Sequence, residues 1–110
     1  MKIIKDDTGN ILALLKENGP VSEMKYNCVE ASFEKHLPQF IVKGDRVDVV
    51  VNHVMEDDHY IEWILVDYID CQVIKHFMPG EECVLNTYYK EGMVAYSYCN
   101  KHGLWKNELK

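Results

Sequence analysis

The sequence lacks the segments that would mark an exported or membrane-bound protein. No run approaches the roughly 20 consecutive apolar residues that a membrane-spanning helix needs, and the first ten residues have no apolar core of the signal-peptide kind. No two cysteines form a C-x-x-C pair, and no segment is of low complexity. We therefore expect one globular domain in the cytoplasm, with no membrane partner and with reduced cysteines.

Positive charge is also scarce. Twelve Lys and Arg residues stand against 18 Asp and Glu residues, which gives a formal net charge of -6 and a pI near 5.3. A nucleic-acid-binding surface needs clustered basic residues to replace counterions. We therefore exclude nucleic acid as a partner, and we expect that any anionic substrate is attracted by a local positive group.

The four cysteines fall into two kinds. Cys28, Cys71 and Cys83 lie in or beside apolar runs, where a reduced cysteine behaves as a small buried apolar residue. Cys99 differs because His102 follows it three positions later. One tight turn can aim a thiolate and an imidazole at this spacing toward a single point, which is typical of metal ligands.

Short runs of β-branched and aromatic residues, separated by turns, follow from residue 38 onward. They predict strands about every ten residues, at 39–43, 46–53, 60–68, 71–77, 83–90 and 93–99. Helix-length periodicity is missing from this region. The pattern predicts an all-β fold, an immunoglobulin-like antiparallel β-sandwich. Strand alternation within 60–68 would place Ile61, Trp63 and Leu65 on one face.

We predict that residues 1–24 form an appendage to a sandwich domain of residues 25–110. Turn-forming sequences at 7–10 and 18–20 bracket an apolar run at 11–15. We predict a strand for this run.

Histidine and cysteine together indicate a metal site. The candidate donors lie at predicted turns or strand ends and are His36, His53, His59, Cys99 and His102. Four imidazoles and one thiolate exceed what a tetrahedral zinc site uses. An octahedral metal would keep one position open, and the ligand count favours iron over copper or zinc. His76 lies inside a predicted strand, and we do not expect it to be a ligand.

Three motifs occur in order: E-K-H-x-P at 34–38, H-V-M-E-D-D-H-Y-I-E-W-I at 53–64 and C-N-x-H-G-L-W at 99–105. Over about residues 25–110 the chain resembles the superoxide reductases, the neelaredoxin and desulfoferrodoxin family. The resemblance implies one-electron reduction of superoxide to hydrogen peroxide, for detoxification, at a mononuclear non-haem iron. It also implies that the four histidines are equatorial ligands and that Cys99 is the axial ligand.

The same resemblance assigns roles to two further residues. Glu34 looks like the residue that fills the sixth position in the ferric state. Lys35 looks like the positive group that attracts superoxide to an otherwise acidic protein. Both are therefore predicted catalytic residues.

The chain differs from the long members of that family in its N-terminal region. Those members bind a second iron through four cysteines of a desulforedoxin-like module, whereas this chain has no cysteine before Cys28. Residues 8–11 resemble a remnant of the module without its ligands. The resemblance then implies one iron per chain, electrons from rubredoxin or another small redox protein, and a homodimer or homotetramer.

Two other functions remain open from the residues. A blue-copper electron-transfer protein would use His53, Cys99 and His102, but its weak axial methionine follows the last histidine, whereas Met93 precedes Cys99. That interpretation also leaves His36 and His59 without a role. The second alternative is a non-catalytic immunoglobulin-like interaction domain with a structural metal.

Overall fold

The computed structural model describes residues 1–29 and 35–110, and within these residues all regular structure is β. The strands are β1 (Lys2–Lys5), β2 (Ile11–Leu14), β3 (Gln39–Lys43), β4 (Arg46–Val50), β5 (Ile61–Asp67), β6 (Gln72–His76), β7 (Val84–Tyr88), β8 (Val94–Cys99) and β9 (Gly103–Glu108). Across the same residues, no helix has the length and apolar character needed to cross a membrane.

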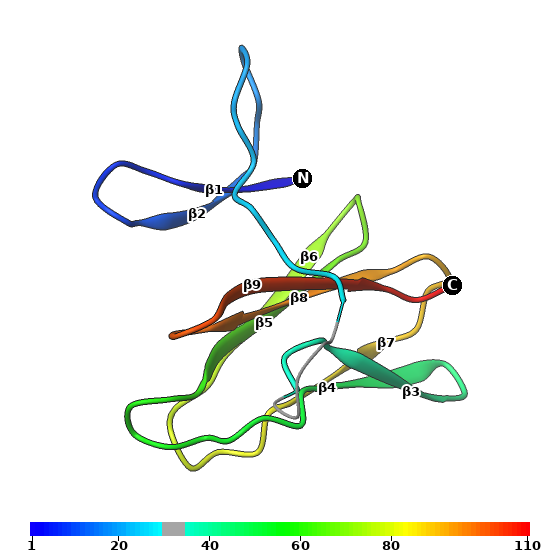
Figure 1. Ribbon diagram of the computed structural model, residues 1–110. Helices are drawn as coiled ribbons and strands as arrows, with labels where there is room; N and C mark the ends of the chain where they lie inside the picture. Colours follow the sequence, from blue (N-terminus) through cyan, green and yellow to red (C-terminus); the bar gives the residue numbers. More distant parts are fainter. Residues whose placement is uncertain (30–34) are drawn as a thin grey trace.

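Two antiparallel sheets form the body of the molecule. One has the strand order β3-β4-β7 and the other β6-β5-β8-β9, and Figure 1 shows them as two layers with the β1-β2 hairpin outside. The predicted all-β antiparallel sandwich is confirmed, and so is a strand in the run at 11–15, as β2. We did not predict β9. Its Leu104 and Trp105 are adjacent and both buried, so β9 lacks the alternation that marks a half-buried strand.

The main core lies between the two sheets. Val47 and Val49 of β4 share one buried cluster with Ile64 of β5, Leu85 of β7 and Ala95 of β8. Each of these side chains is at most 6% exposed. Burial of a Val, Ile or Leu side chain contributes about 1.5–3 kcal/mol, so this cluster is the main source of stability for the sandwich.

A register shift in β5 changes which residues share a face. Ile61 pairs with Cys99 and Trp63 pairs with Tyr98, so two residues of β5 advance against one of β8. Such a bulge turns the following side chains to the other face. Ile61 therefore joins the core between the sheets, whereas Trp63 and Leu65 face the N-terminal hairpin. Our prediction that all three share a face was wrong, because strict alternation does not hold across a bulge.

The cysteines outside the predicted metal site are not all buried. Cys83 is buried, as predicted, and burial raises the pKa of its thiol to about 12. Cys28 is exposed and Cys71 is half-buried, so the prediction was wrong for Cys28 and only partly right for Cys71. Cys71 lies beside the edge strand β6, and its Sγ is 3.0 Å from the Tyr88 hydroxyl.

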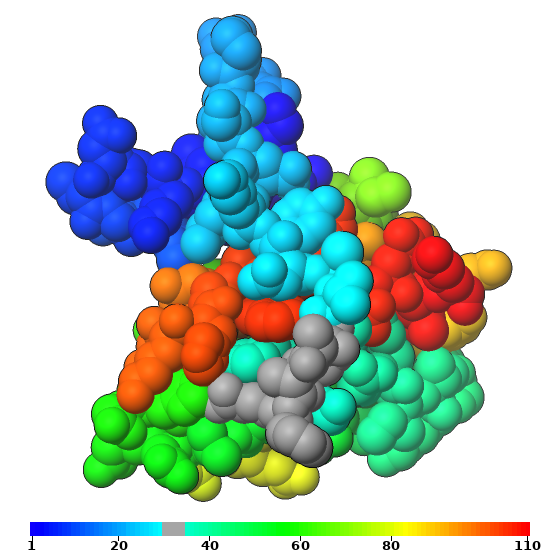
Figure 2. Space-filling view, in the orientation of Figure 1, coloured from blue at the N-terminus to red at the C-terminus, as the bar shows by residue number. Residues whose placement is uncertain are grey.

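The N-terminal hairpin covers the outer face of the four-stranded sheet. Ile3 is 2% exposed and forms a second core cluster with Leu65, Tyr96 and Leu104. In Figure 2 the chain after the hairpin crosses the orange and red surface of β9. There Asn27 donates its N–H to Leu104 and accepts one from Lys106, which extends the sheet at the β9 edge.

The turn of this hairpin is closed by a carboxylate. Asp6 accepts hydrogen bonds from the side chain and backbone of Asn10 and from Thr8. The bonds from Asn10 contribute most to lowering the pKa of Asp6 to about 2. Side-chain hydrogen bonds thus hold the β1-β2 turn.

Candidate metal centre

The five predicted donors come together at one end of the sandwich. The ligand atoms of His36, His53, His59, Cys99 and His102 all lie within 4.8 Å of one another. They come from the segment before β3, the connection between β4 and β5, the last residue of β8 and the β8-β9 turn. Loops from distant parts of the sequence meet at the end of a sandwich, and these donors meet there.

The β8-β9 turn brings Cys99 and His102 together. Cys99 pairs with Gly103, so the turn between the strands contains three residues. Gly103 closes it with φ 81°, a conformation that residues with a Cβ rarely adopt. As a result, Cys99 Sγ lies 3.8 Å from His102 Nδ1. The predicted effect of this spacing is confirmed.

The connection between β4 and β5 delivers two histidines. Glu56 and His59 exchange backbone hydrogen bonds of 3.0 and 3.1 Å, which fold the connection back on itself. The ring of His53 donates from Nδ1 to the carbonyl of Val54 at 2.6 Å. Its Nε2 lies 3.6 Å from Cys99 Sγ. Such a bond on the outer nitrogen fixes the orientation of a metal-ligating imidazole.

His36 is held against β8 and β9. Its ring stacks on Trp105 with centroids 4.5 Å apart and an interplanar angle of 9°. Its carbonyl accepts a hydrogen bond from the buried Ser97 hydroxyl at 2.5 Å. Two residues later, the carbonyl of Pro38 accepts one from the Asn107 amide at 2.8 Å. These contacts place His36 Nε2 3.1 Å from His102 Nδ1.

The four imidazoles surround one point. Their ring contacts form a closed circuit with centroid separations of 4.8 Å (His36 to His53), 4.7 Å (His53 to His59), 5.1 Å (His59 to His102) and 4.9 Å (His102 to His36). With metal–nitrogen bonds of about 2.1 Å, neighbouring nitrogens would lie about 3.0 Å apart and opposite ones about 4.2 Å. The 3.1 Å between His36 Nε2 and His102 Nδ1, and the 4.8 Å within which all the donor atoms lie, are close to these separations, so the group fits a metal site.

Burial differs across the donor set. Cys99 is 0% exposed and belongs to the main core cluster, and His36 is 3% exposed. His53 and His59 are half-buried, and His102 is exposed. The sulfur therefore approaches from the protein interior, and the site reaches the surface at His102.

The remaining sequence predictions have different outcomes. Glu34 lies outside the described residues. Lys35 is exposed and directly precedes His36. His76 lies on the edge strand β6 and is not among the five clustered donors, in agreement with the prediction. Sequence reasoning missed the supporting contacts of Ser97 and Asn107. In the sequence, the serine at position 97 within the otherwise apolar or aromatic run 94–99 is a signal that could have pointed to such a contact.

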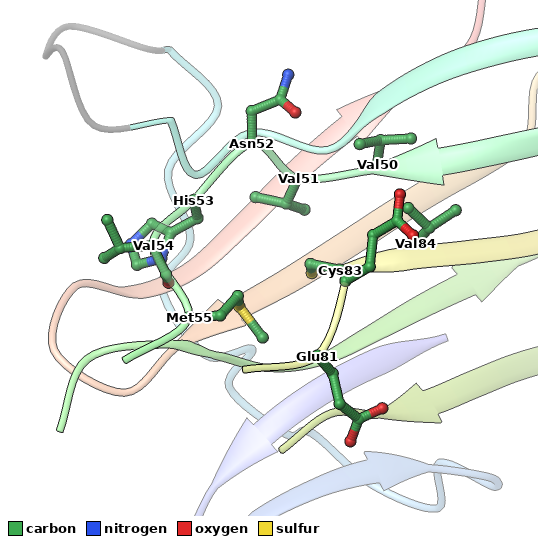
Figure 3. Close-up of a pocket in the computed structure, with 10 residues that line it drawn as sticks. Val50, Val51, Asn52, His53, Val54, Met55, Glu81, Cys83 and Val84 are labelled. Carbon is green, nitrogen blue, oxygen red and sulfur yellow. The ribbon is translucent and has the colours of Figure 1, made fainter. Parts of the chain in front are cut away.

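A cavity of about 440 Å³ lies beside the donors. Figure 3 shows that His53 and Met55 line it from the connection after β4, and Cys83 and Glu81 from the segment before β7. The high pKa of Cys83 keeps its thiol protonated at neutral pH. The cavity thus gives solvent access to one flank of His53 without adding a second thiolate.

The chain is similar to known proteins over most of its length. The desulfoferrodoxin family model matches residues 28–108. The desulfoferrodoxin of Desulfarculus baarsii is 37% identical over 115 residues, spanning 91% of this chain and 89% of that protein. The chain belongs to the desulfoferrodoxin family.

Solved structures agree with this family membership. The one-iron superoxide reductase of Giardia intestinalis is 26% identical, with a TM-score of 0.60 over 70% of this chain and 98% of that chain. The superoxide reductase of Treponema pallidum is 21% identical, with a TM-score of 0.70 over 97% of this chain and 99% of that chain. The second likeness shows that the fold, including the N-terminal hairpin region, is shared almost end to end.

Proposed function

We propose that this member of the desulfoferrodoxin family is a superoxide reductase, which reduces superoxide by one electron to hydrogen peroxide. The observation that carries the proposal is the convergence of four imidazoles and one thiolate at a single point. The family membership and the likeness to the one-iron superoxide reductase of Giardia intestinalis support it. Its role would be superoxide detoxification.

The metal in this proposal is one mononuclear non-haem iron per chain. The residues that would hold it are His36, His53, His59, Cys99 and His102. When bound, iron supplies the electron: superoxide, one electron and two protons give hydrogen peroxide. The chain contributes the donor set, and a thiolate in a buried position is a strong electron donor to a metal.

Lys35 and Glu34 are the proposed catalytic residues. The exposed ammonium of Lys35, next to a ligand, would raise the local concentration of a small anion on a protein of net charge -6. Glu34 would provide a carboxylate that binds the iron in its ferric state. Glu34→Ala should then alter the ferric absorption spectrum while superoxide reduction continues, and an identical ferric spectrum would contradict this role.

The wider organisation of the protein is also proposed. Residues 1–24 would be a cysteine-free remnant of a desulforedoxin-like module, and residues 25–110 the iron-binding sandwich domain. Packing of Ile3 on the outer sheet face supports a structural role for the remnant. A small redox protein such as rubredoxin would supply electrons near the exposed His102. A cytoplasmic location and a homodimer or homotetramer stay predictions.

One experiment tests the proposed function directly. The purified protein is analysed for metal, its oxidised absorption spectrum is recorded, and reductant and a superoxide source are then added. We expect about one iron per chain, as a single five-donor site requires, a thiolate-to-iron band, and superoxide consumption without release of dioxygen. Colourless zinc-loaded protein that does not react would contradict the proposal.

The blue-copper alternative makes a different prediction in the same experiment. Such a site uses two histidines and one cysteine, whereas four histidines gather around Cys99 here. Copper binding with an intense blue colour would favour electron transfer over catalysis.

A further inference from the structure

Asn100 lies beside the metal centre, in an exposed position, without being one of its donors. It lies in the β8-β9 turn, directly after Cys99 and two residues before His102. Both ends of its side-chain amide are used. Oδ1 accepts a hydrogen bond from the N–H of Tyr60 at 3.0 Å, and Nδ2 donates one to the carbonyl of Asp58 at 2.9 Å.

These two partners are the immediate neighbours of His59. The amide of Asn100 therefore binds the backbone on both sides of one donor, while its own backbone is bonded to another donor, Cys99. The N–H of Asn100 adds a third bond, to the carbonyl of Tyr60 at 3.2 Å. Three hydrogen bonds thus join the turn that carries Cys99 and His102 to the segment that carries His59.

The chemistry of this contact is selective for asparagine. One side chain must accept from an N–H and donate to a carbonyl at the same time, and an amide provides both functions. An aspartate at position 100 would keep the acceptor but lose the donor, and would face the Asp58 carbonyl with a negative charge. The nearby Lys101–Asp58 ion pair, at 3.9 Å between side chains 50% and 81% exposed, adds little.

We propose that the side chain of Asn100 is a positioning residue that holds His59 in register with Cys99 and His102 before the metal arrives. The inference rests on the proposed function, because it assigns the donor set to a metal. It adds that the site is preorganised by a polar contact in the metal-free chain. His59 comes from a connection between sheets. Without the side-chain amide, two of the three hydrogen bonds that hold its neighbours on the β8-β9 turn are lost, and the bond from the Asn100 N–H to the Tyr60 carbonyl remains.

The first measurement uses the metal-free full-length chain. Amide hydrogen exchange of Tyr60 reports the bond to Asn100 Oδ1 residue by residue. In Asn100→Ala we expect exchange at Tyr60 to be faster by about fivefold or more, as loss of one hydrogen bond implies. In Asn100→Asp the acceptor remains, so Tyr60 stays protected. Asn86→Ala is the matched control, since Asn86 is bonded to Arg46 and Asp48 on the other sheet.

The second measurement is titration of the same variants with Co²⁺, whose absorption reports ligand number and thiolate binding. Loss of a partner that orients a ligand lowers metal affinity by about 10- to 100-fold. We expect this loss in Asn100→Ala, a smaller loss in Asn100→Asp and none in Asn86→Ala. The Co²⁺ spectrum of Asn100→Ala should keep the thiolate band, while its d–d bands shift because the ligand field of the nitrogen donors changes.

The outcomes separate this inference from the proposed function. Wild-type Tyr60 exchange and wild-type Co²⁺ affinity in Asn100→Ala would overturn the positioning role and leave the superoxide reductase proposal unaffected. Equal losses in Asn100→Ala and Asn86→Ala would also overturn it, because the effect would then be general destabilisation. A wild-type chain that binds no Co²⁺ would overturn the proposed function and this inference together.

Discussion

The five candidate donors reach the metal centre in two different ways. Cys99 and His102 belong to the β8-β9 hairpin, and a three-residue turn sets their separation. His36 lies 66 positions before His102, and His53 lies 46 positions before Cys99. Two of the three distant donors are contacted through other residues of the same hairpin: Trp105 and Ser97 contact His36, and Asn100 bonds to both neighbours of His59. The hairpin is therefore both a ligand source and the template for the other ligands.

The largest loss of turnover should come from removing a donor that belongs to the β8-β9 hairpin itself. Cys99→Ser removes the thiolate, so we expect turnover to fall by at least about 100-fold, since even loss of an outer partner of a ligand costs 10- to 100-fold. The thiolate-to-iron band should disappear from the oxidised spectrum. Cys28→Ser, at an exposed position, is the control. Unchanged superoxide reduction in Cys99→Ser would remove sulfur from the mechanism.

The template role can be tested at Trp105. Trp105→Ala removes the ring stacked on His36 and the indole N–H donated to the His102 carbonyl at 3.2 Å. We expect a loss of about 3–5 kcal/mol in the free energy of unfolding, measured by urea denaturation. Trp105→Phe keeps a ring against His36 but loses the hydrogen bond, so its loss should be near 1 kcal/mol. Equal losses in both variants would mean that the stack contributes nothing.

The N-terminal hairpin offers a contrast, because it stabilises the same sheet from the outer face. Ile3→Ala should lower the free energy of unfolding by about 2 kcal/mol. This loss is at the low end for a buried Ile, because the N-terminal hairpin lies on the outside of the sheet and can shift to reduce the cavity. The iron content and the oxidised spectrum should stay as in the wild type. A changed spectrum would show that the outer face also shapes the metal centre.

The smallest effect on the reaction is expected from a substitution outside the donor set. Lys35→Ala should slow the reaction with superoxide by a few-fold at low salt. Raising the ionic strength should reduce the difference in rate between the variant and the wild type. Iron content should not change. Lys16→Ala removes the same charge from an exposed position in the N-terminal segment and is the matched control. Equal rates in the two variants at every salt concentration would exclude steering by Lys35.

Some features of the fold were predictable and others were not. Alternating β-branched residues such as Val47 and Val49 predict strands, because a pleated strand with one buried face repeats every two residues. The bulge between Ile61 and Trp63 was not predictable from that period, and it reverses the face of Trp63. β9 was missed because Leu104 and Trp105 are buried on opposite faces, one beneath the N-terminal hairpin and the other against His36.

The sequence by itself indicated the five candidate donors that the fold brings together. It also determined the separation of Cys99 and His102, since a short turn ending in Gly103 leaves few alternative geometries. It also determined the alternation that makes two sheets with a shared core. Only the tertiary structure decided that His36 lies against Trp105 and that Asn100 bonds on both sides of His59. Those contacts join residues far apart in the chain, and their geometry follows from how the two sheets and their connecting loops pack.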